Sequence, residues 1–158
     1  MRNKMKLSKY LLIAACSCFL TPTSSAALIN DMQSCQGTLD AISALLDKTQ
    51  IDYPADDVKV LRKGFDQYNQ FIQDEIVTPG LIKLYQGDSS KTEEIQKMID
   101  GYKANMVKAF QKRYHDNRLY MDHAVTINEC TKKAVPTGDA LQDLIAAYKS
   151  LEKLTYIK

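Results

Sequence analysis

Apolar residues recur every three or four positions along most of this 158-residue chain. That spacing places them on one side of an α-helix, so it predicts a series of amphipathic helices. The clearest stripe consists of Val58, Leu61, Phe65, Tyr68, Ile72 and Ile76. We find no convincing alternation of polar and apolar residues, which a half-buried strand would require. The periodicity therefore predicts an all-α fold.

Capping and turn-forming residues divide this pattern into segments. We expect helices over residues 28–48, 54–77, 90–114, 118–134 and 137–154. The second helix should end or kink at Thr78, Pro79 and Gly80, because the residue before a proline resists helical geometry. Residues 81–85 are compatible with a short additional turn. Ser90 and Glu93 have the spacing of a capping box, which would start the third helix.

A break is expected at residues 115–117, because an unbroken helix over residues 91–133 would exceed the size of the domain. Thr137 is expected to cap the last helix. The sequence thus predicts a single-domain bundle of four long helices and a shorter fifth helical element.

The first 27 residues have the features of an export signal. An apolar run at residues 11–20 is followed by small residues up to Ala27, and it is preceded by Arg2, Lys4, Lys6 and Lys9. The run is too short to cross a bilayer as a helix. We therefore expect residues 1–27 to be removed, and residues 28–158 to work in the periplasm or outside the cell without a transmembrane segment.

Cys16 keeps a second interpretation of this leader open. Residues 13–16 (Ile-Ala-Ala-Cys) have the form of a lipoprotein cleavage box, in which the cysteine would carry a lipid anchor. The apolar run before Cys16 is short for such a signal, so soluble export is the favoured interpretation.

Removal of the leader changes the sign of the net charge. The leader holds four basic residues and no acidic one, which lowers the formal charge of +2 by four, to −2. A weakly acidic exported domain gives no electrostatic reason to bind nucleic acid, so we expect no nucleic-acid partner.

Cys35 and Cys130 are the two cysteines that remain after the leader. Each lies on the apolar stripe of its helix, and two thiols in an oxidising compartment most simply pair. There is no CxxC motif and no nearby cluster of cysteine and histidine, which argues against a redox or metal-binding role. The sequence predicts one structural disulfide between them.

The two histidines, His115 and His123, are the first candidates for metal or cofactor ligands. They are eight positions apart, which on one helix is about 12 Å of rise, too far to share a metal ion. No CxxCH motif for covalent haem is present, and a Met32–His123 axial pair is only weakly indicated. We therefore predict neither a metal nor a cofactor.

Aromatic and basic side chains alternate along the third predicted helix. Tyr102 and Tyr114 lie near its apolar side, whereas Lys108 and Lys112 lie on the opposite side. This arrangement favours a solvated amphipathic helix over an anion-binding stripe. The candidate ligand or interface residues are nevertheless Tyr102, Lys108, Lys112, Tyr114, His115 and His123.

No GxSxG, HExxH or SxxK motif occurs after the leader, so the sequence leans away from an enzyme. Our leading hypothesis is a non-enzymatic periplasmic protein that binds another protein of the cell envelope, as an inhibitor, immunity factor, chaperone or adaptor. One alternative is a bundle that holds haem or a lipid in its interior. Another is an enzyme whose site is assembled from several helices.

Overall fold

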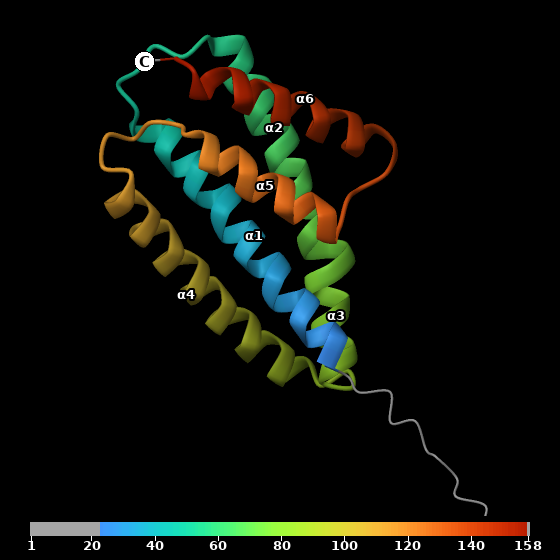
Figure 1. Ribbon diagram of the computed structural model, residues 1–158. Helices are drawn as coiled ribbons and strands as arrows, with labels where there is room; N and C mark the ends of the chain where they lie inside the picture. Colours follow the sequence, from blue (N-terminus) through green and yellow to red (C-terminus); the bar gives the residue numbers. More distant parts are fainter. Residues whose placement is uncertain (1–22, 158) are drawn as a thin grey trace, which may run out of the picture.

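A computed structural model describes residues 23–157, and its regular structure there is entirely helical (Figure 1). The elements are α1 (Thr23–Lys48), α2 (Ala55–Phe71), the π-helical segment η1 (Ile72–Val77), α3 (Thr78–Leu84), α4 (Ser89–Arg113), α5 (Met121–Lys133) and α6 (Gly138–Thr155). Since α2, η1 and α3 follow one another without a gap, these elements make five continuous helical segments. Within residues 23–157 there is no strand, which confirms the all-α prediction.

The predicted leader falls mostly outside the described residues. Its basic residues, its apolar run and Cys16 all precede Thr23, where α1 begins. Removal of the leader therefore stays a prediction. Cleavage after Ala26 or Ala27 would leave α1 starting near Leu28, and that helix continues to Lys48 as the sequence predicted.

α1 is the central helix of the bundle. It contacts α4 on one side and α5 on another, while α2, η1 and α3 pack along the rest of it (Figure 1). Residues 35–39 are buried without interruption, although the sequence predicted a single apolar stripe. The additional buried positions hold small or uncharged residues such as Gly37 and Thr38, which fit between neighbouring helices at little cost.

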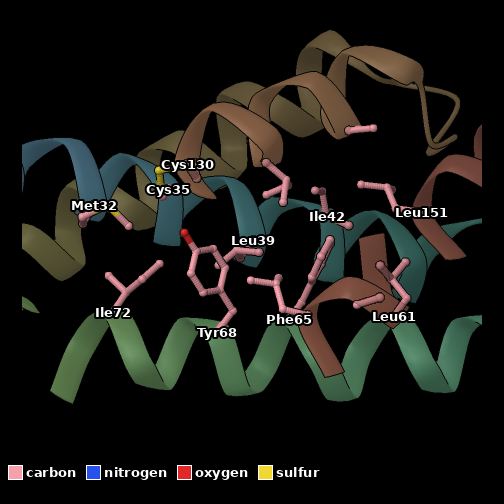
Figure 2. Close-up of a cluster of buried hydrophobic side chains, with 14 of the residues drawn as sticks. Met32, Cys35, Leu39, Ile42, Leu61, Phe65, Tyr68, Ile72, Cys130 and Leu151 are labelled. Atoms are coloured by element: carbon pink, nitrogen blue, oxygen red, sulfur yellow. A yellow bond between two sulfur atoms is a disulfide. The ribbon is translucent and has the colours of Figure 1, made fainter. Parts of the chain in front are cut away.

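The disulfide predicted between Cys35 and Cys130 is present and links α1 to α5, with a Cα–Cα distance of 5.8 Å (Figure 2). Both cysteines are buried in the main apolar cluster. Next to them lies Tyr68 of α2, whose hydroxyl donates a hydrogen bond of 2.7 Å to the carbonyl oxygen of Ala134. Burial raises the pKa of the Tyr68 hydroxyl well above its usual value. The polar tip of this core tyrosine is thus satisfied by the backbone that follows α5.

The sequence predicted that the second helix ends or kinks at Thr78, Pro79 and Gly80, and of these two outcomes the end is wrong. η1 precedes this site, and the backbone N–H of Thr78 donates to the carbonyl of Gln73 in the wider π-helical pattern. Pro79 then occupies the first turn of α3, where the missing N–H needs no partner. The chain therefore continues as a helix and buries Leu81.

The start of α4 also differs from the sequence prediction. Its N-cap is Asp88, whose carboxylate accepts a hydrogen bond of 3.1 Å from the backbone N–H of Lys91. Ser90 already lies inside the helix, so the capping box predicted for Ser90 and Glu93 is wrong. At α6 the predicted N-cap position, Thr137, is confirmed, although its side chain makes no capping hydrogen bond.

Close packing of α6 against α2 depends on Gly64. A Cβ at this position would lie 2.3 Å from the carbonyl oxygen of Asp143 and 2.6 Å from the Cβ of Ala147. At Gly37, between α1 and α4, a Cβ would lie 2.8 Å from the sulfur of Met106, a flexible side chain that can move aside. Of these two glycines, Gly64 is therefore the one that sets a helix spacing through backbone contact.

Candidate functional site

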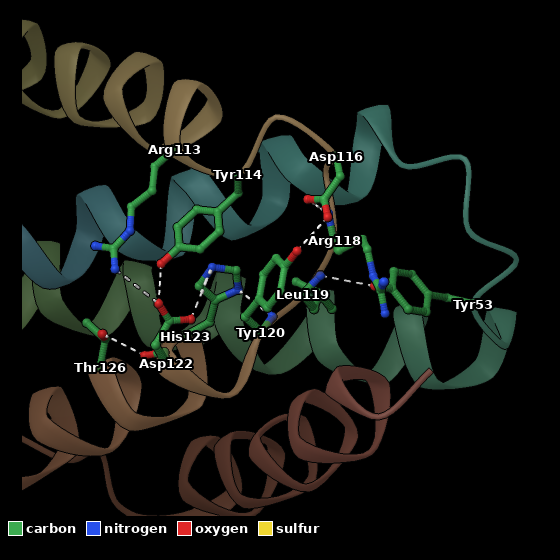
Figure 3. Close-up of polar contacts among 10 residues, drawn as sticks. All are labelled: Tyr53, Arg113, Tyr114, Asp116, Arg118, Leu119, Tyr120, Asp122, His123 and Thr126. Carbon is green, nitrogen blue, oxygen red and sulfur yellow. Dashed lines mark hydrogen bonds and ion pairs between the residues drawn. The ribbon is translucent and has the colours of Figure 1, made fainter. Parts of the chain in front are cut away.

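Of the six candidate site residues, the structure brings two together. Tyr114 and His123 pack edge to face with ring centroids 4.4 Å apart, at the point where the chain passes from α4 to α5 (Figure 3). His115 lies exposed in the break between these helices, as predicted. The other three, Tyr102, Lys108 and Lys112, lie exposed on α4 and are not part of this cluster.

His123 is enclosed by aromatic rings and is 1% exposed. The centroids of Phe110 and Tyr120 lie 4.9 Å and 6.0 Å from that of the imidazole. Its Nδ1 accepts a hydrogen bond of 3.1 Å from the backbone N–H of Tyr120, the N-cap of α5. Because Nδ1 accepts, the proton of the neutral ring resides on Nε2. Nε2 has no hydrogen-bond partner within residues 23–157, and the nearest carboxylate oxygen, Oδ1 of Asp122, is 3.8 Å away.

Burial is the main influence on the protonation of His123. It lowers the pKa of the imidazole to about 4, although the carboxylate of Asp122 acts in the opposite direction. The ring is therefore neutral at physiological pH. The burial of His123 could not be read from its own helix, because the aromatic rings that cover it come from α4 and from the connecting segment.

The surrounding polar groups tie the connecting segment to both helices. The hydroxyl of Tyr114 donates to Oδ2 of Asp122, and the guanidinium of Arg113 lies 3.5 Å from the same oxygen. Burial, followed by the bond to Asp122, raises the pKa of Tyr114 to about 12. The hydroxyl of Tyr120 donates to Asp116 in the same way (Figure 3).

This geometry suits a structural role better than a chemical one. A substrate would have to displace Tyr114 or Phe110 to reach Nε2 of His123. The hydroxyl of Tyr114 stays protonated and is occupied by Asp122, so it is a poor nucleophile or base at neutral pH. The cluster closes one end of the bundle and caps α5.

A second polar site lies where α1, α2, η1 and α4 meet. Its cavity has a volume of about 370 Å³ and is lined by Gln36, Asp40, Asp66, Asn69, Gln70, Gln73, Asp74 and Lys103. Burial raises the pKa of Asp40, whose carboxylate accepts a hydrogen bond of 2.8 Å from Asn69. Asp66 and Asp74 are exposed. Across residues 23–157, no three His, Cys, Asp or Glu side chains come close enough together to hold a metal ion.

A more apolar hollow lies between α5 and α6. This hollow, which we call the α5–α6 groove, has a volume of about 320 Å³ and is lined by Asn128, Thr131, Val135, Leu141, Leu144, Ile145, Tyr148, Lys149 and Glu152. The sequence does not predict this groove, because Leu141, Ile145 and Tyr148 have the spacing of one apolar helix side and so would be expected to face the core. The adjacent pair Leu144 and Ile145 was the available signal, since neighbours on a helix point about 100° apart.

A further hollow lies between α1 and α4, with a volume of about 330 Å³. Met98 and Tyr102 line it from α4 and are 65% and 52% exposed. The predicted site residue Tyr102 therefore borders a surface cavity.

Comparison with known proteins provides no counterpart: no family model, no curated protein and no solved structure matches this chain. The helices within residues 23–157 include none with the length and apolar character that a membrane span requires. We therefore infer function from the surface that residues 23–157 present and from its chemistry.

Proposed function

We propose that this protein is an exported, non-enzymatic helical protein that binds another protein of the cell envelope through the α5–α6 groove. The observation that carries this proposal is the apolar character of that groove. Val135 and Ile145 are 48% and 41% exposed, and the partly buried Leu141 and Tyr148 line the same groove. Exposed apolar surface of this kind beside a hollow is typical of interaction sites.

The shape of the groove favours a helix as the occupant. α5 and α6 lie side by side, joined by a short connection, and together they present two neighbouring helical ridges (Figure 1). An amphipathic helix can lay its apolar side between two such ridges. Asn128, Thr131, Lys149 and Glu152 form a polar rim, which suits a partner helix whose flanks carry both polar and charged residues.

Export is supported by the leader and by the buried disulfide. Structural disulfides persist in oxidising compartments and are rare in the cytoplasm. The disulfide fixes α5, which forms one side of the groove, to α1. This restraint lowers the conformational entropy that is lost when a partner binds. Neither alternative from the sequence, an interior haem or lipid or an enzyme site, is favoured by a particular contact or cavity among residues 23–157.

The test is affinity capture from a cell-envelope extract with matched variants. Ile145→Lys places a charge in the groove, whereas Ile82→Lys makes the same change at an isoleucine of α3 that is 47% exposed. We expect a partner that the wild type and Ile82→Lys capture and Ile145→Lys does not. Equal capture by all three proteins, or by none of them, would refute the proposal.

A further inference from the structure

α4 carries an exposed line of residues on the side that does not face α1. Consecutive residues turn by about 100° around a helix, so six positions lie within about 40° of one line along it. They are Glu94, Met98, Gly101, Asn105, Lys108 and Lys112, and all six are exposed. We call this set the α4 stripe. α4 lies at the edge of the bundle, where it packs along α1 (Figure 1).

Gly101 is the first observation that calls for a partner at this stripe. A glycine inside a helix destabilises it relative to alanine, so it needs a packing reason. Gly64 has one, because a Cβ there would collide with the neighbouring helix. A Cβ at Gly101 would meet nothing within 4 Å, yet this residue is near the middle of α4. The backbone of α4 is thus open to close approach from outside.

The apolar surface beside Gly101 is the second observation. Met98 and Tyr102 are the most exposed large apolar side chains of α4. They border the hollow between α1 and α4, so the stripe is continuous with a concave surface. A helix that packs along the stripe would cover Met98, with Tyr102 at its edge.

The distribution of charge along α4 identifies the occupant. Between Asp100 and Asp116 the chain has four basic residues and no acidic one, whereas residues 89–100 of α4 hold three acidic and two basic residues. Glu94 and Lys112 are 18 residues apart, which is five full turns, so they point in the same direction from opposite ends of the stripe. An antiparallel copy of the same helix would bring Glu94 of each copy opposite Lys112 of the other.

We propose that two copies of this chain pair through their α4 stripes, antiparallel about a twofold axis that crosses the stripe at the level of residue 103. Glu94 and Lys112 each lie nine residues from Lys103, about 13 Å along the helix, so Glu94 of one copy would face Lys112 of the other. Gly101 would face Asn105, and the aliphatic part of Lys108 would cover Met98. Such an interface is self-complementary, so assembly stops at a dimer.

Charge reversal tests this arrangement by sedimentation equilibrium of the purified protein. Glu94→Lys and Lys112→Glu should each weaken the dimer about tenfold, because every substitution acts twice in a twofold interface and replaces attraction by repulsion. The double variant Glu94→Lys/Lys112→Glu should restore the wild-type dissociation constant to within about threefold, because both ion pairs are re-formed. High salt should weaken the wild type and the double variant alike.

Two further variants separate the interface from the fold. Glu93→Lys makes the same charge change one residue away, about 100° off the stripe, and should leave the dimer unchanged. Gly101→Leu should abolish the dimer while the thermal unfolding temperature stays the same or rises, since leucine favours the helix and meets no neighbour.

A wild-type protein that remains monomeric up to its solubility limit would overturn the proposal. A dimer that the charge reversals and Gly101→Leu leave intact would overturn it as well, and would indicate another face such as the α5–α6 groove. Capture of an envelope partner by that groove is measured separately, so the two proposals can fail independently.

Discussion

Replacing His123 with glutamine should remove a large part of the dependence of stability on pH. The imidazole is buried among aromatic rings, and its pKa falls from 6.5 in the unfolded chain to about 4 in the folded protein. Glutamine at the same position can still accept a hydrogen bond from the backbone N–H of Tyr120, as the third residue of a capping box does. The substitution therefore removes the titration while retaining the cap.

The sign and size of the effect follow from this shift. Because the folded pKa is the lower one, the unfolded chain takes up the proton first as the pH falls. The contribution of neutral His123 to stability is complete above pH 6.5, declines between pH 6.5 and about pH 4, and is constant below that. The difference in pKa corresponds to about 3 kcal/mol, a considerable share of a typical domain stability of about 5–15 kcal/mol.

Urea unfolding at a series of pH values from 7 to 4 measures this contribution. The groups that face the imidazole are the carboxylates of Asp122 and Asp116, the guanidinium of Arg113 and the hydroxyl of Tyr114, and the variant retains all of them. The wild type should lose about 3 kcal/mol more than His123→Gln over this range. His115→Gln, at the exposed histidine, should follow the wild type. Parallel profiles for the wild type and His123→Gln would refute the reasoning.

Three further expectations concern the crosslink, the glycines and the leader. Replacing Cys35 and Cys130 together by alanine should cost about 4–5 kcal/mol in urea unfolding, because the bridge closes a separation of 95 residues; a loss below about 1 kcal/mol would contradict a stabilising role. Gly64→Ala should lower the free energy of unfolding by about 1–3 kcal/mol, because it forces α2 and α6 apart. Gly101→Ala should raise that free energy by up to about 1 kcal/mol, and equal effects at the two glycines would contradict the packing described. The intact mass of the exported protein should correspond to cleavage after Ala26 or Ala27; an added lipid mass on Cys16 would instead show a lipoprotein.

The helical segments and the disulfide could be predicted from local spacing. Cys35 and Cys130 each lie on the apolar side of their own predicted helix, so the spacing of apolar residues in two separate segments was enough to place both sulfurs in the core. The break at residues 115–117 followed from the size of the domain. The helical segments and the burial of the two cysteines could be predicted because each depends on neighbours within a few turns of the same helix.

The errors have a different origin. A helix was expected to end or kink at Pro79, but it continues, because η1 supplies a wider hydrogen-bonding pattern just before the proline, and no local residue indicates a π-helical segment. The start of α4 was placed two residues late because Asp88 competes with Ser90 for the role of cap. The burial of residues 35–39 on all sides reflects the central place of α1, which only the assembled bundle decides.

The candidate site was the least predictable part. Tyr114 and His123 were selected separately, and their contact depends on how the chain turns between α4 and α5. The α5–α6 groove arises because α6 packs mainly on α2, and so leaves Ile145 at its edge. Periodicity shows which side of a helix is apolar, but it cannot tell whether another helix will cover that side.

Site-specific photocrosslinking in living cells tests the central claim, that the α5–α6 groove binds a partner protein, most directly. A photoreactive amino acid would replace Ile145, and in a matched strain it would replace Ile82 of α3. We expect a discrete, light-dependent adduct with one envelope protein from position 145 and none from position 82. No adduct at position 145, or the same adducts from both positions, would contradict it.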